Sequence, residues 1–456
     1  MPRARISVAA ALLLTLGLGL SAYAISDDPF LGGEPGFGRT QQILAGLGVL
    51  LAAGAALRPA ARRRLLAATL ATLATLALAE LLLAQFAGCR LRQPYVYDPE
   101  LLFALRPGAC GEFRHLPANG GHTVRYRVNQ DGFRGPELRT DGTLRVMVYG
   151  DSFVQAIYTA EEHTFARRLE HHLRQALGTE VEVVNAGIAS YGPDQALLKM
   201  ARELPKYRPD LVVMAVFAGN DFGDLERNKL FRLAADGTLV RNPKAQLADH
   251  LYQRFAVGAR ESLLKSALRR AGSAAEAAIP ADVDRAADRD TALVEYWLQL
   301  ALAEHASTDD VVGNVSVDFY NADVALLPEA PSSRQRVQLM AGVLARMQAL
   351  AQQQKTPLFG LAIPHPMDVC EHYDTGRVDT GKYPGYRRTN LTDAVLAGWR
   401  AAGVPALDLF PLLAGGQCES RFLKAGDDHW SDLGQEFAAQ QVAEALVRQG
   451  LVRKRG

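Results

Sequence analysis

Two polar motifs of the chain each follow an apolar run that is typical of a buried strand. Residues 144–149 lead into a Gly-Asp-Ser motif that ends at Ser152, and residues 211–217 lead into a Gly-Asn-Asp motif that contains Asn220. Parallel strands place the residues that follow them at one edge of a sheet, where open α/β sheets bind their ligands. At that edge a serine hydroxyl can act as a nucleophile, and an asparagine amide can stabilise a developing negative charge.

A third apolar run and a motif near the C-terminus add the remaining parts of such a site. Residues 181–185 lead into a glycine-containing loop that includes Ser190, and an Asp-Asp-His motif ends at His429, just before an amphipathic helix expected over 432–448. A histidine can take the serine proton, a carboxylate can orient the imidazole, and backbone N–H groups can bind an oxyanion. The sequence therefore predicts a site for serine-based acyl transfer.

In this order, the four segments resemble those of the SGNH (GDSL-type) hydrolase family, in its membrane-anchored bacterial form. The Gly-Asp-Ser, Gly-Asn-Asp and Asp-Asp-His motifs match the first, third and last blocks of the family, and the resemblance covers roughly residues 140–225 and 335–450. It implies that Ser152 is the nucleophile and that His429 is the base that takes its proton. Asp427 would orient the imidazole and stabilise its protonated form.

The resemblance also implies an oxyanion hole made by the N–H groups of Ser152 and Ser190 and by the side-chain amide of Asn220. Ser190 stands where most members have a glycine, and serine can supply the same backbone N–H, although its Cβ crowds the pocket. The last block reads Asp-x-His instead of Asp-x-x-His, a form that resembles superfamily members involved in polysaccharide O-acetylation. This spacing favours Asp427 as the orienting carboxylate, with Asp428 as the alternative.

Strand-length and helix-length segments alternate over the expected catalytic domain, residues 140–456. This alternation predicts a parallel sheet covered by helices on both faces, and the resemblance implies a three-layer α/β/α, SGNH-hydrolase-like (flavodoxin-like) fold. An Ala-rich, helical insertion at about 224–333 is either a lid that selects the substrate or a packing addition; within it, 251–268 and 290–305 are amphipathic. The expected strands are 144–149, 181–185, 211–217, 357–363 and 405–408, and the expected helices are 164–177, 194–207, 336–354, 391–402 and 432–448.

Residues 1–87 form a membrane region in which we expect three transmembrane helices, over 6–25, 43–57 and 65–87. The first and third apolar stretches reach the length of about 20 residues that crosses a bilayer core, and the middle one is marginal and could be re-entrant. Three consecutive segments with almost no polar face do not fit buried helices of a soluble core. Residues 88–139 follow as a lead-in segment, in which the alternating stretch 124–137 predicts an edge strand or hairpin packed against the core.

Charge predicts how the membrane region is oriented. Basic residues precede the first span and lie between the second and third, whereas the loop between the first two spans is mainly acidic. The positive-inside rule then places the N-terminus in the cytoplasm and everything after residue 87 on the periplasmic side. Cleavage of a signal peptide after Ala22-Tyr23-Ala24 is the alternative, and it leaves the catalytic domain on the same side. We therefore expect a multi-pass protein of the inner membrane.

The four cysteines are compatible with two disulfides in an oxidising compartment. We prefer the pairs Cys89–Cys110 and Cys370–Cys418, with four buried thiols as the alternative. No Cys-x-x-Cys motif is present, which argues against redox catalysis and zinc binding. His365, Cys370 and His372 could be drawn as a metal cluster, but we expect them to support a loop, and we predict neither a metal nor a cofactor.

Composition adds no second kind of function to the acyl chemistry that the motifs indicate. The net charge of +1 gives no reason to expect a nucleic-acid partner, and 48% hydrophobic residues in 456 allow a large core. Three functions stay open: an esterase or deacylase acting on an envelope glycan, a lipid or a small ester, an O-acetyltransferase of exopolysaccharide or cell wall, and a catalytically silent glycan-binding protein. The natural substrate, the acyl chain length and the oligomeric state are not determined by the sequence.

Overall fold

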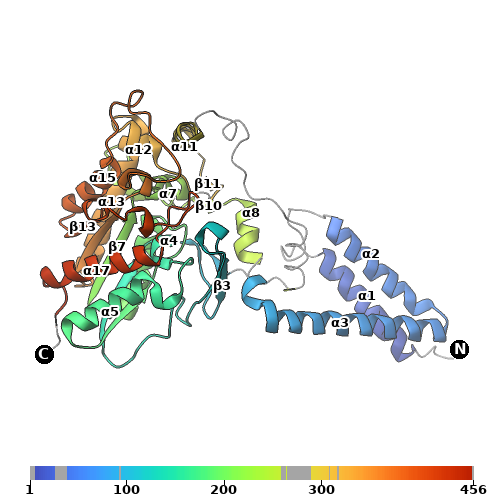
Figure 1. Cartoon of the computed structure of the whole chain (residues 1–456). Coiled ribbons are helices and arrows are strands. Elements are labelled where there is room, and N and C mark those ends of the chain that lie inside the picture. Colours follow the sequence, from blue (N-terminus) through green and yellow to red (C-terminus); the bar gives the residue numbers. More distant parts are fainter. Residues whose placement is uncertain are drawn as a thin grey trace. The chain divides into compact units, whose positions relative to one another are not determined.

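The chain divides into two compact units, one of residues 1–96 and 249–275 and one of residues 97–248 and 276–456. The computed structural model describes most of both units (Figure 1). The described residues are 6–25, 39–91, 94–257, 263, 289–307, 309–315 and 318–453.

The first unit contains the apolar N-terminal helices α1 (Val8–Ile25), α2 (Arg39–Ala53) and α3 (Pro59–Leu91). Helices α1 and α2 pack closely because two glycines leave room for the neighbouring backbone: a Cβ added to Gly17 would lie 2.5 Å from Gly48 O. By length and hydropathy, Val8–Ile25 and Pro59–Cys89 could each cross a bilayer, while α2 is shorter. Helix α3 begins earlier than its apolar stretch predicts, because Pro59 suits the first helical position and the Ala- and Arg-rich turn after it favours a helix.

A five-stranded parallel sheet forms the centre of the second unit. Its strands are β5 (Leu144–Tyr149), β6 (Val181–Asn185), β7 (Leu211–Phe217), β12 (Leu358–Ile363) and β13 (Ala406–Asp408), in the spatial order β13-β12-β7-β5-β6. The chain therefore winds outward in both directions from β5 and β7, which is the flavodoxin-like order with its switch point between these two strands. The predicted fold class is confirmed.

Helices cover both faces of the sheet, as its central buried strands require. On one face, α5 (Phe165–Leu177) and α17 (Asp432–Arg448) share a core with Val146 and Val148 of β5. On the other, Lys199 of α6 (Pro193–Tyr207) lies over the Tyr149 ring. Trp399 of α15 (Asn390–Ala401) fills the space beside Gly360 of β12, and α13 (Pro331–Gln353) packs against α6 and α15. Helix α13 begins five residues before its prediction, because Pro331 takes the first helical position.

The lead-in segment adds small antiparallel elements at the edge of the sheet. Strands β3 (Cys110–Arg114) and β4 (Thr123–Arg127) form a hairpin, and β2 spans Leu102–Leu105. After β4 the chain turns at Gly132, whose φ is 87°. Arg134 then bridges both Val128 and Asn185 of β6. The alternating stretch 124–137 thus packs against the sheet as the pattern predicts.

The buried guanidinium of Arg336 helps to anchor the described part of the insertion to the sheet domain. Arg336 of α13 is fully buried and contacts three carboxylates: Glu226 at 2.6 Å, Asp323 at 3.1 Å and Glu304 at 3.2 Å. These belong to α7 (Asp221–Asn228), α12 (Ala322–Leu326) and α11 (Arg289–Ala306). Helix α11 confirms the helix predicted over 290–305, whereas most of the helix predicted over 251–268 lies outside the described residues. The remaining named elements are β1 (Tyr95–Asp98), α4 (Ser152–Gln155), β8 (Phe231–Leu233), β9 (Leu239–Arg241), β10 (Gln246–Leu247), α8 (Asp249–Tyr252), β11 (Val311–Val312), α14 (Pro366–Val369) and α16 (Phe410–Leu413).

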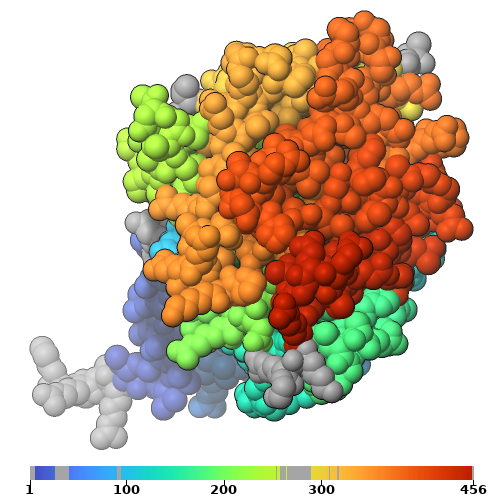
Figure 2. All heavy atoms as spheres, turned by 90° about the vertical axis from the view of Figure 1, so that its left-hand side faces the viewer, coloured from blue at the N-terminus to red at the C-terminus, as the bar shows by residue number. Residues whose placement is uncertain are grey.

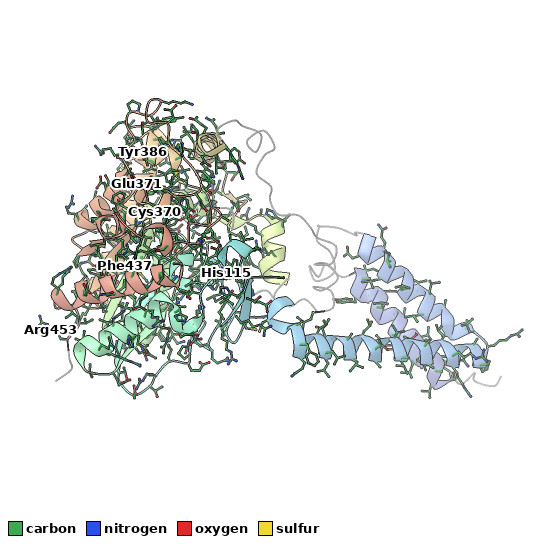
Figure 3. All side chains as sticks on the ribbon, in the orientation of Figure 1. His115, Cys370, Glu371, Tyr386, Phe437 and Arg453 are labelled. Atoms are coloured by element: carbon green, nitrogen blue, oxygen red, sulfur yellow. A yellow bond between two sulfur atoms is a disulfide. The ribbon has the colours of Figure 1, made fainter. Side chains whose placement is uncertain are left out.

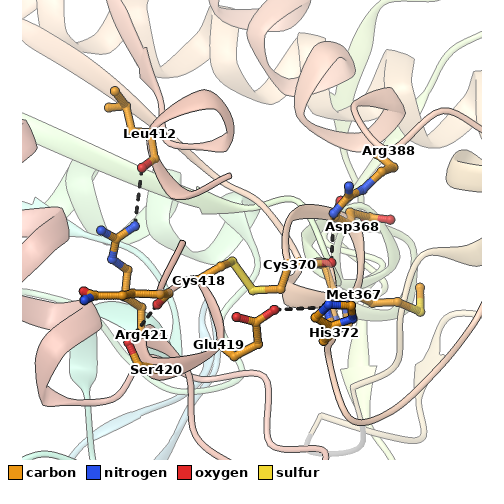
Figure 4. The surroundings of a disulfide bond; sticks show 12 residues. Met367, Asp368, Cys370, His372, Arg388, Leu412, Cys418, Glu419, Ser420 and Arg421 are labelled. Carbon is orange, nitrogen blue, oxygen red and sulfur yellow. Dashed lines mark hydrogen bonds between the residues drawn. A yellow bond between two sulfur atoms is a disulfide. The ribbon is translucent and has the colours of Figure 1, made fainter. Parts of the chain in front are cut away.

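A disulfide joins the loop that follows α14 to the loop that follows α16. Cys370 and Cys418 are bonded, as predicted, which removes Cys370 as a metal ligand beside His365 and His372. Around this bond, Glu419 accepts a hydrogen bond from the His372 backbone N–H (Figure 4). The Cys89–Cys110 pairing remains a prediction.

Segments from about residue 320 onward, coloured orange to red, form most of the face of the molecule that Figure 2 shows.

Replacing Cys370 and Cys418 together by serine should lower the free energy of unfolding. The bond closes a loop of 48 residues in sequence separation, for which the chain-entropy model gives about 4 kcal/mol. Thermal unfolding of the double variant, compared with the parent chain without reductant, measures the loss. An unchanged melting temperature would mean that the bond does not constrain the unfolded chain.

Candidate active site

The turn after β5 presents Ser152 at the carboxyl edge of the sheet. Asp151 caps the short helix α4, and its Oδ1 accepts a hydrogen bond of 2.9 Å from the Phe153 N–H. The turn requires Gly150, because an added Cβ there would lie 2.6 Å from Cγ2 of Val154. Ser152 thus starts a helix whose N-terminal N–H groups can face a negative charge.

His429 reaches Ser152 from the loop before α17. Its Nε2 lies 2.7 Å from Oγ of Ser152, and its Nδ1 lies 2.7 Å from Oδ1 of Asp427. The same Asp427 oxygen accepts the His429 backbone N–H at 3.1 Å. The structure therefore brings Ser152, His429 and Asp427 into one hydrogen-bonded chain, in which the serine can pass its proton to a neutral imidazole.

Packing and backbone hydrogen bonds fix the loop that carries His429. Asp374 accepts hydrogen bonds from the N–H groups of Ala425 (2.7 Å) and Gly426 (3.1 Å). The imidazole stacks on the ring of Phe153, with 5.2 Å between ring centroids. The next residue, Trp430, is buried against the same ring. The histidine is thus held in position by its own loop and by the nucleophile turn.

Asp428 is a second carboxylate beside the imidazole, because its Oδ1 lies 3.3 Å from Nδ1 of His429. The Asp427 contact is shorter, which fits the preference for Asp427, yet the structure brings both carboxylates to the ring. Among the described residues, these three form the group whose potential ligand atoms all lie within 4.8 Å of one another. When Nδ1–H donates to a carboxylate, Nδ1 has no lone pair for a metal ion and Nε2 can accept the serine proton.

The environment of His429 favours the protonated imidazole. Burial alone would lower the pKa of His429. The hydrogen bond to Asp427 and the charges of Asp428, Asp427 and Asp151 outweigh that effect and raise it to about 9. Burial also raises the pKa of the Asp151 carboxyl to about 7. An imidazolium next to carboxylates is therefore stable in the free site, and the base becomes available as the pH rises.

Asn220 follows β7 and is positioned by the end of the insertion. Asn321, which is fully buried, donates its backbone N–H to Gly219 O at 2.7 Å and accepts the Gly223 N–H at 2.9 Å. These two bonds fix the turn that carries Asn220. The Asn220 side-chain amide lies next to the carboxylate of Asp318. Because the amide carries two N–H groups, one of them can face an oxyanion while the other faces this carboxylate.

Ser190 lies in the loop after β6 with its backbone in the left-handed region, at φ 63°. The N–H groups on either side of it are used: Ala189 donates to Gln155 Oε1 (2.6 Å), and Tyr191 donates to Ile188 O (3.1 Å). Among the described residues, the Ser190 N–H has no hydrogen-bond acceptor. This is the condition that a donor to a transient oxyanion needs.

Residues 319–456 match a family model described as an SGNH hydrolase-like domain, acetyltransferase AlgX. The chain carries an SGNH hydrolase-like domain. The matched segment contains Asp427 and His429, whereas Ser152 and Asn220 precede it.

Solved structures similar to the chain include a lipase/acylhydrolase from Enterococcus faecalis (13% identity, TM-score 0.32, covering 68% of this chain and 99% of that one). They also include TesA (14% identity, TM-score 0.33, covering 68% of this chain and 99% of that one). A third is the acetyl xylan esterase AlAXEase (12% identity, TM-score 0.34, covering 66% of this chain and 99% of that one). No curated protein matches the chain.

The lead-in hairpin contacts the catalytic loop, which the sequence did not indicate. The Tyr158 ring lies 4.2 Å from the His429 ring between centroids. Nε2 of His115, in the hairpin (Figure 3), lies 2.6 Å from the Tyr158 carbonyl oxygen. Asn119 exchanges two hydrogen bonds with the backbone of Lys424.

Of the aromatic residues near the motifs, four are packing residues with at most 1% exposure, namely Phe153, Tyr191, Phe222 and Trp430, whereas Tyr158 is only half-buried.

His365 also lies near the SGNH-like site, and sequence reasoning placed it only in a loop-supporting cluster. Its Nε2 is 3.5 Å from Oδ2 of Asp428. The signal that could have found it is the same as for Ser152 and Asn220, because His365 is a polar residue just past the end of a buried strand.

Replacing Asn220 by alanine should lower kcat for ester hydrolysis about 100- to 1000-fold with little change in KM, because the amide acts only on the developing oxyanion. Steady-state kinetics measure the split between kcat and KM. Ser190→Ala is the matched control, since it keeps the backbone N–H and should change kcat little. An Asn220→Ala variant as active as the parent would remove the amide from the oxyanion hole.

The rate should depend on pH through His429. Only the neutral imidazole accepts the serine proton, so kcat/KM should rise about tenfold per pH unit below a pKa of about 9 and then level off. A pH series with the Ser152→Ala background subtracted measures this limb. A profile that levels off near pH 7 would contradict the influence of the two carboxylates on the imidazole.

Proposed function

We propose that this chain is a membrane-anchored serine esterase or deacylase. It would act on an O-acyl ester of an envelope glycan, a lipid or a small molecule through an acyl-serine intermediate. The observation that supports it most strongly is the hydrogen-bonded chain from Ser152 through His429 to Asp427, with 2.7 Å at each step. This geometry activates a serine and has little use in a protein that only binds a glycan.

The proposed reaction follows from the atoms that meet at the sheet edge. Oγ of Ser152 attacks the ester carbonyl while its proton passes to Nε2 of His429. The resulting oxyanion is stabilised by the N–H groups of Ser152 and Ser190 and by the Asn220 amide. Collapse of the tetrahedral intermediate breaks the ester bond, and the imidazolium gives its proton to the leaving alkoxide. Water, activated by the neutral imidazole, then releases the acid.

Acyl transfer to a sugar hydroxyl is the second candidate. The matched family model carries the name of an acetyltransferase, and the first half of the reaction would be identical. The difference is the acceptor that attacks the acyl-serine, either water or a glycan hydroxyl. The half-buried Tyr158 beside His429 offers a ring on which a sugar could stack.

Membrane anchorage and a periplasmic catalytic domain are part of the proposal. Two helices, Val8–Ile25 and Pro59–Cys89, have the length and hydropathy of membrane spans. The Arg-rich segment 58–64 would face the cytoplasm under the positive-inside rule. The Cys370–Cys418 bond supports an oxidising compartment for the second unit.

The proposal is tested with the full chain in detergent and p-nitrophenyl acetate, butyrate and octanoate as substrates. Ser152→Ala and His429→Ala should each lower hydrolysis by at least about 10⁴-fold while leaving thermal unfolding unchanged, because each removes one member of the proton-transfer unit. Activity that persists in a folded Ser152→Ala variant would refute the acyl-serine mechanism.

Adding an isotopically labelled acyl donor together with a glycan acceptor separates the two candidates. An esterase releases the label as free acid whether or not the glycan is present. A transferase moves it to the glycan and hydrolyses the donor slowly in its absence. Label that reaches neither product would leave the silent glycan-binding protein as the remaining reading.

A further inference from the structure

His365 has one tautomer that fits its surroundings. It caps α14, and its Nδ1 accepts a hydrogen bond of 3.1 Å from the Met367 N–H. An imidazole nitrogen that accepts from a backbone N–H carries a lone pair, so the ring proton of neutral His365 is on Nε2. The side chain is buried, stacked on the ring of Phe217 at 5.8 Å. His365 is therefore a fixed hydrogen-bond donor.

Asp428 lies between this donor and the base. Its Oδ2 is 3.5 Å from Nε2 of His365, and its Oδ1 is 3.3 Å from Nδ1 of His429. The side chain is 30% exposed, so without a partner it could turn toward solvent. One carboxylate thus links a histidine at the end of β12 to the catalytic loop.

We propose that Asp428 and His365 are positioning residues for the general base. His365 holds the Asp428 carboxylate beside His429, where it supplements Asp427 in fixing the imidazole and stabilising its protonated form. The inference rests on the proposed function, since it assigns the base two carboxylates instead of one.

Electrostatics agree with this arrangement. Burial would raise the pKa of the Asp428 carboxyl, but the neighbouring imidazoles of His365 and His429 hold it below its usual range. Asp428 is therefore ionised throughout the pH range in which His429 titrates. The other polar and titratable groups that face the two imidazoles belong to Asp151, Ser152, Tyr158, Asp318, Tyr320, Asp368, Tyr373 and Asp427.

The direct test is a histidine NMR titration of the full chain in detergent with ¹³C-labelled histidine, because it needs no substrate. Asp428→Asn should lower the pKa of His429 by about one unit, since it removes a negative charge next to Nδ1. Asp432→Asn removes a similar charge from the exposed start of α17 and should leave this pKa unchanged. An unshifted His429 in a folded Asp428→Asn variant would overturn the proposal.

Variants of His365 test whether it acts through Asp428. His365→Leu should lower the pKa of His429 in the parent chain and add nothing in the Asp428→Asn background. His365→Gln should restore most of the parent value, because its amide nitrogen can replace Nε2 as donor. Equal effects of His365→Leu in both backgrounds, or a raised pKa, would show that His365 does not act through this carboxylate.

A second readout separates this inference from the proposed function. The rate at which a fluorophosphonate labels Ser152 should follow the same pH limb, shifted about one unit toward acid in Asp428→Asn. No labelling in any variant, with the NMR shifts present, would refute the acyl-serine function and leave the positioning pair standing. Labelling of Ser152 whose pH dependence is the same in Asp428→Asn as in the parent chain would refute only the positioning role of Asp428 and His365.

Discussion

The candidate site depends on one contact between distant parts of the chain, the 2.7 Å hydrogen bond between Ser152 Oγ and His429 Nε2. These residues are 277 positions apart. They meet because the β5 turn and the loop before α17 both end at the carboxyl edge of one parallel sheet, next to its switch point. A serine hydroxyl far from a base is a poor nucleophile at neutral pH, so sheet order determines whether this site can react at all.

Much of the remaining structure limits the movement of the two partners. Asp374 binds the loop that carries His429, and the Cys370–Cys418 bond holds the segment that precedes this loop. Asn321 fixes the turn that carries Asn220. Such support matters because proton transfer and oxyanion binding tolerate little displacement. The carboxylates raise the pKa of His429, which strengthens the base but also keeps it protonated at neutral pH.

The sequence predicts the sheet and the motifs well because both depend on local patterns. A buried parallel strand reads as an apolar run, and the polar residue just past it, such as Ser152 or Asn220, falls at the ligand-binding edge. The contacts of Asn321, Tyr158 and His365 join segments whose proximity depends on tertiary packing, and no spacing in the chain encodes them. His365 shows the limit: its place at a strand end was readable, whereas its distance to Asp428 requires the register of β12 in the folded sheet.

The proposed mechanism requires a covalent acyl intermediate on Ser152. This intermediate can be trapped by mixing the full chain with p-nitrophenyl acetate, quenching in acid and mapping the peptides by mass spectrometry. We expect an acetyl group on the peptide that contains Ser152, dependent on His429 and absent from Ser152→Ala. Rapid hydrolysis with no acetyl-serine, or acetylation that persists at the same level in His429→Ala, would contradict it.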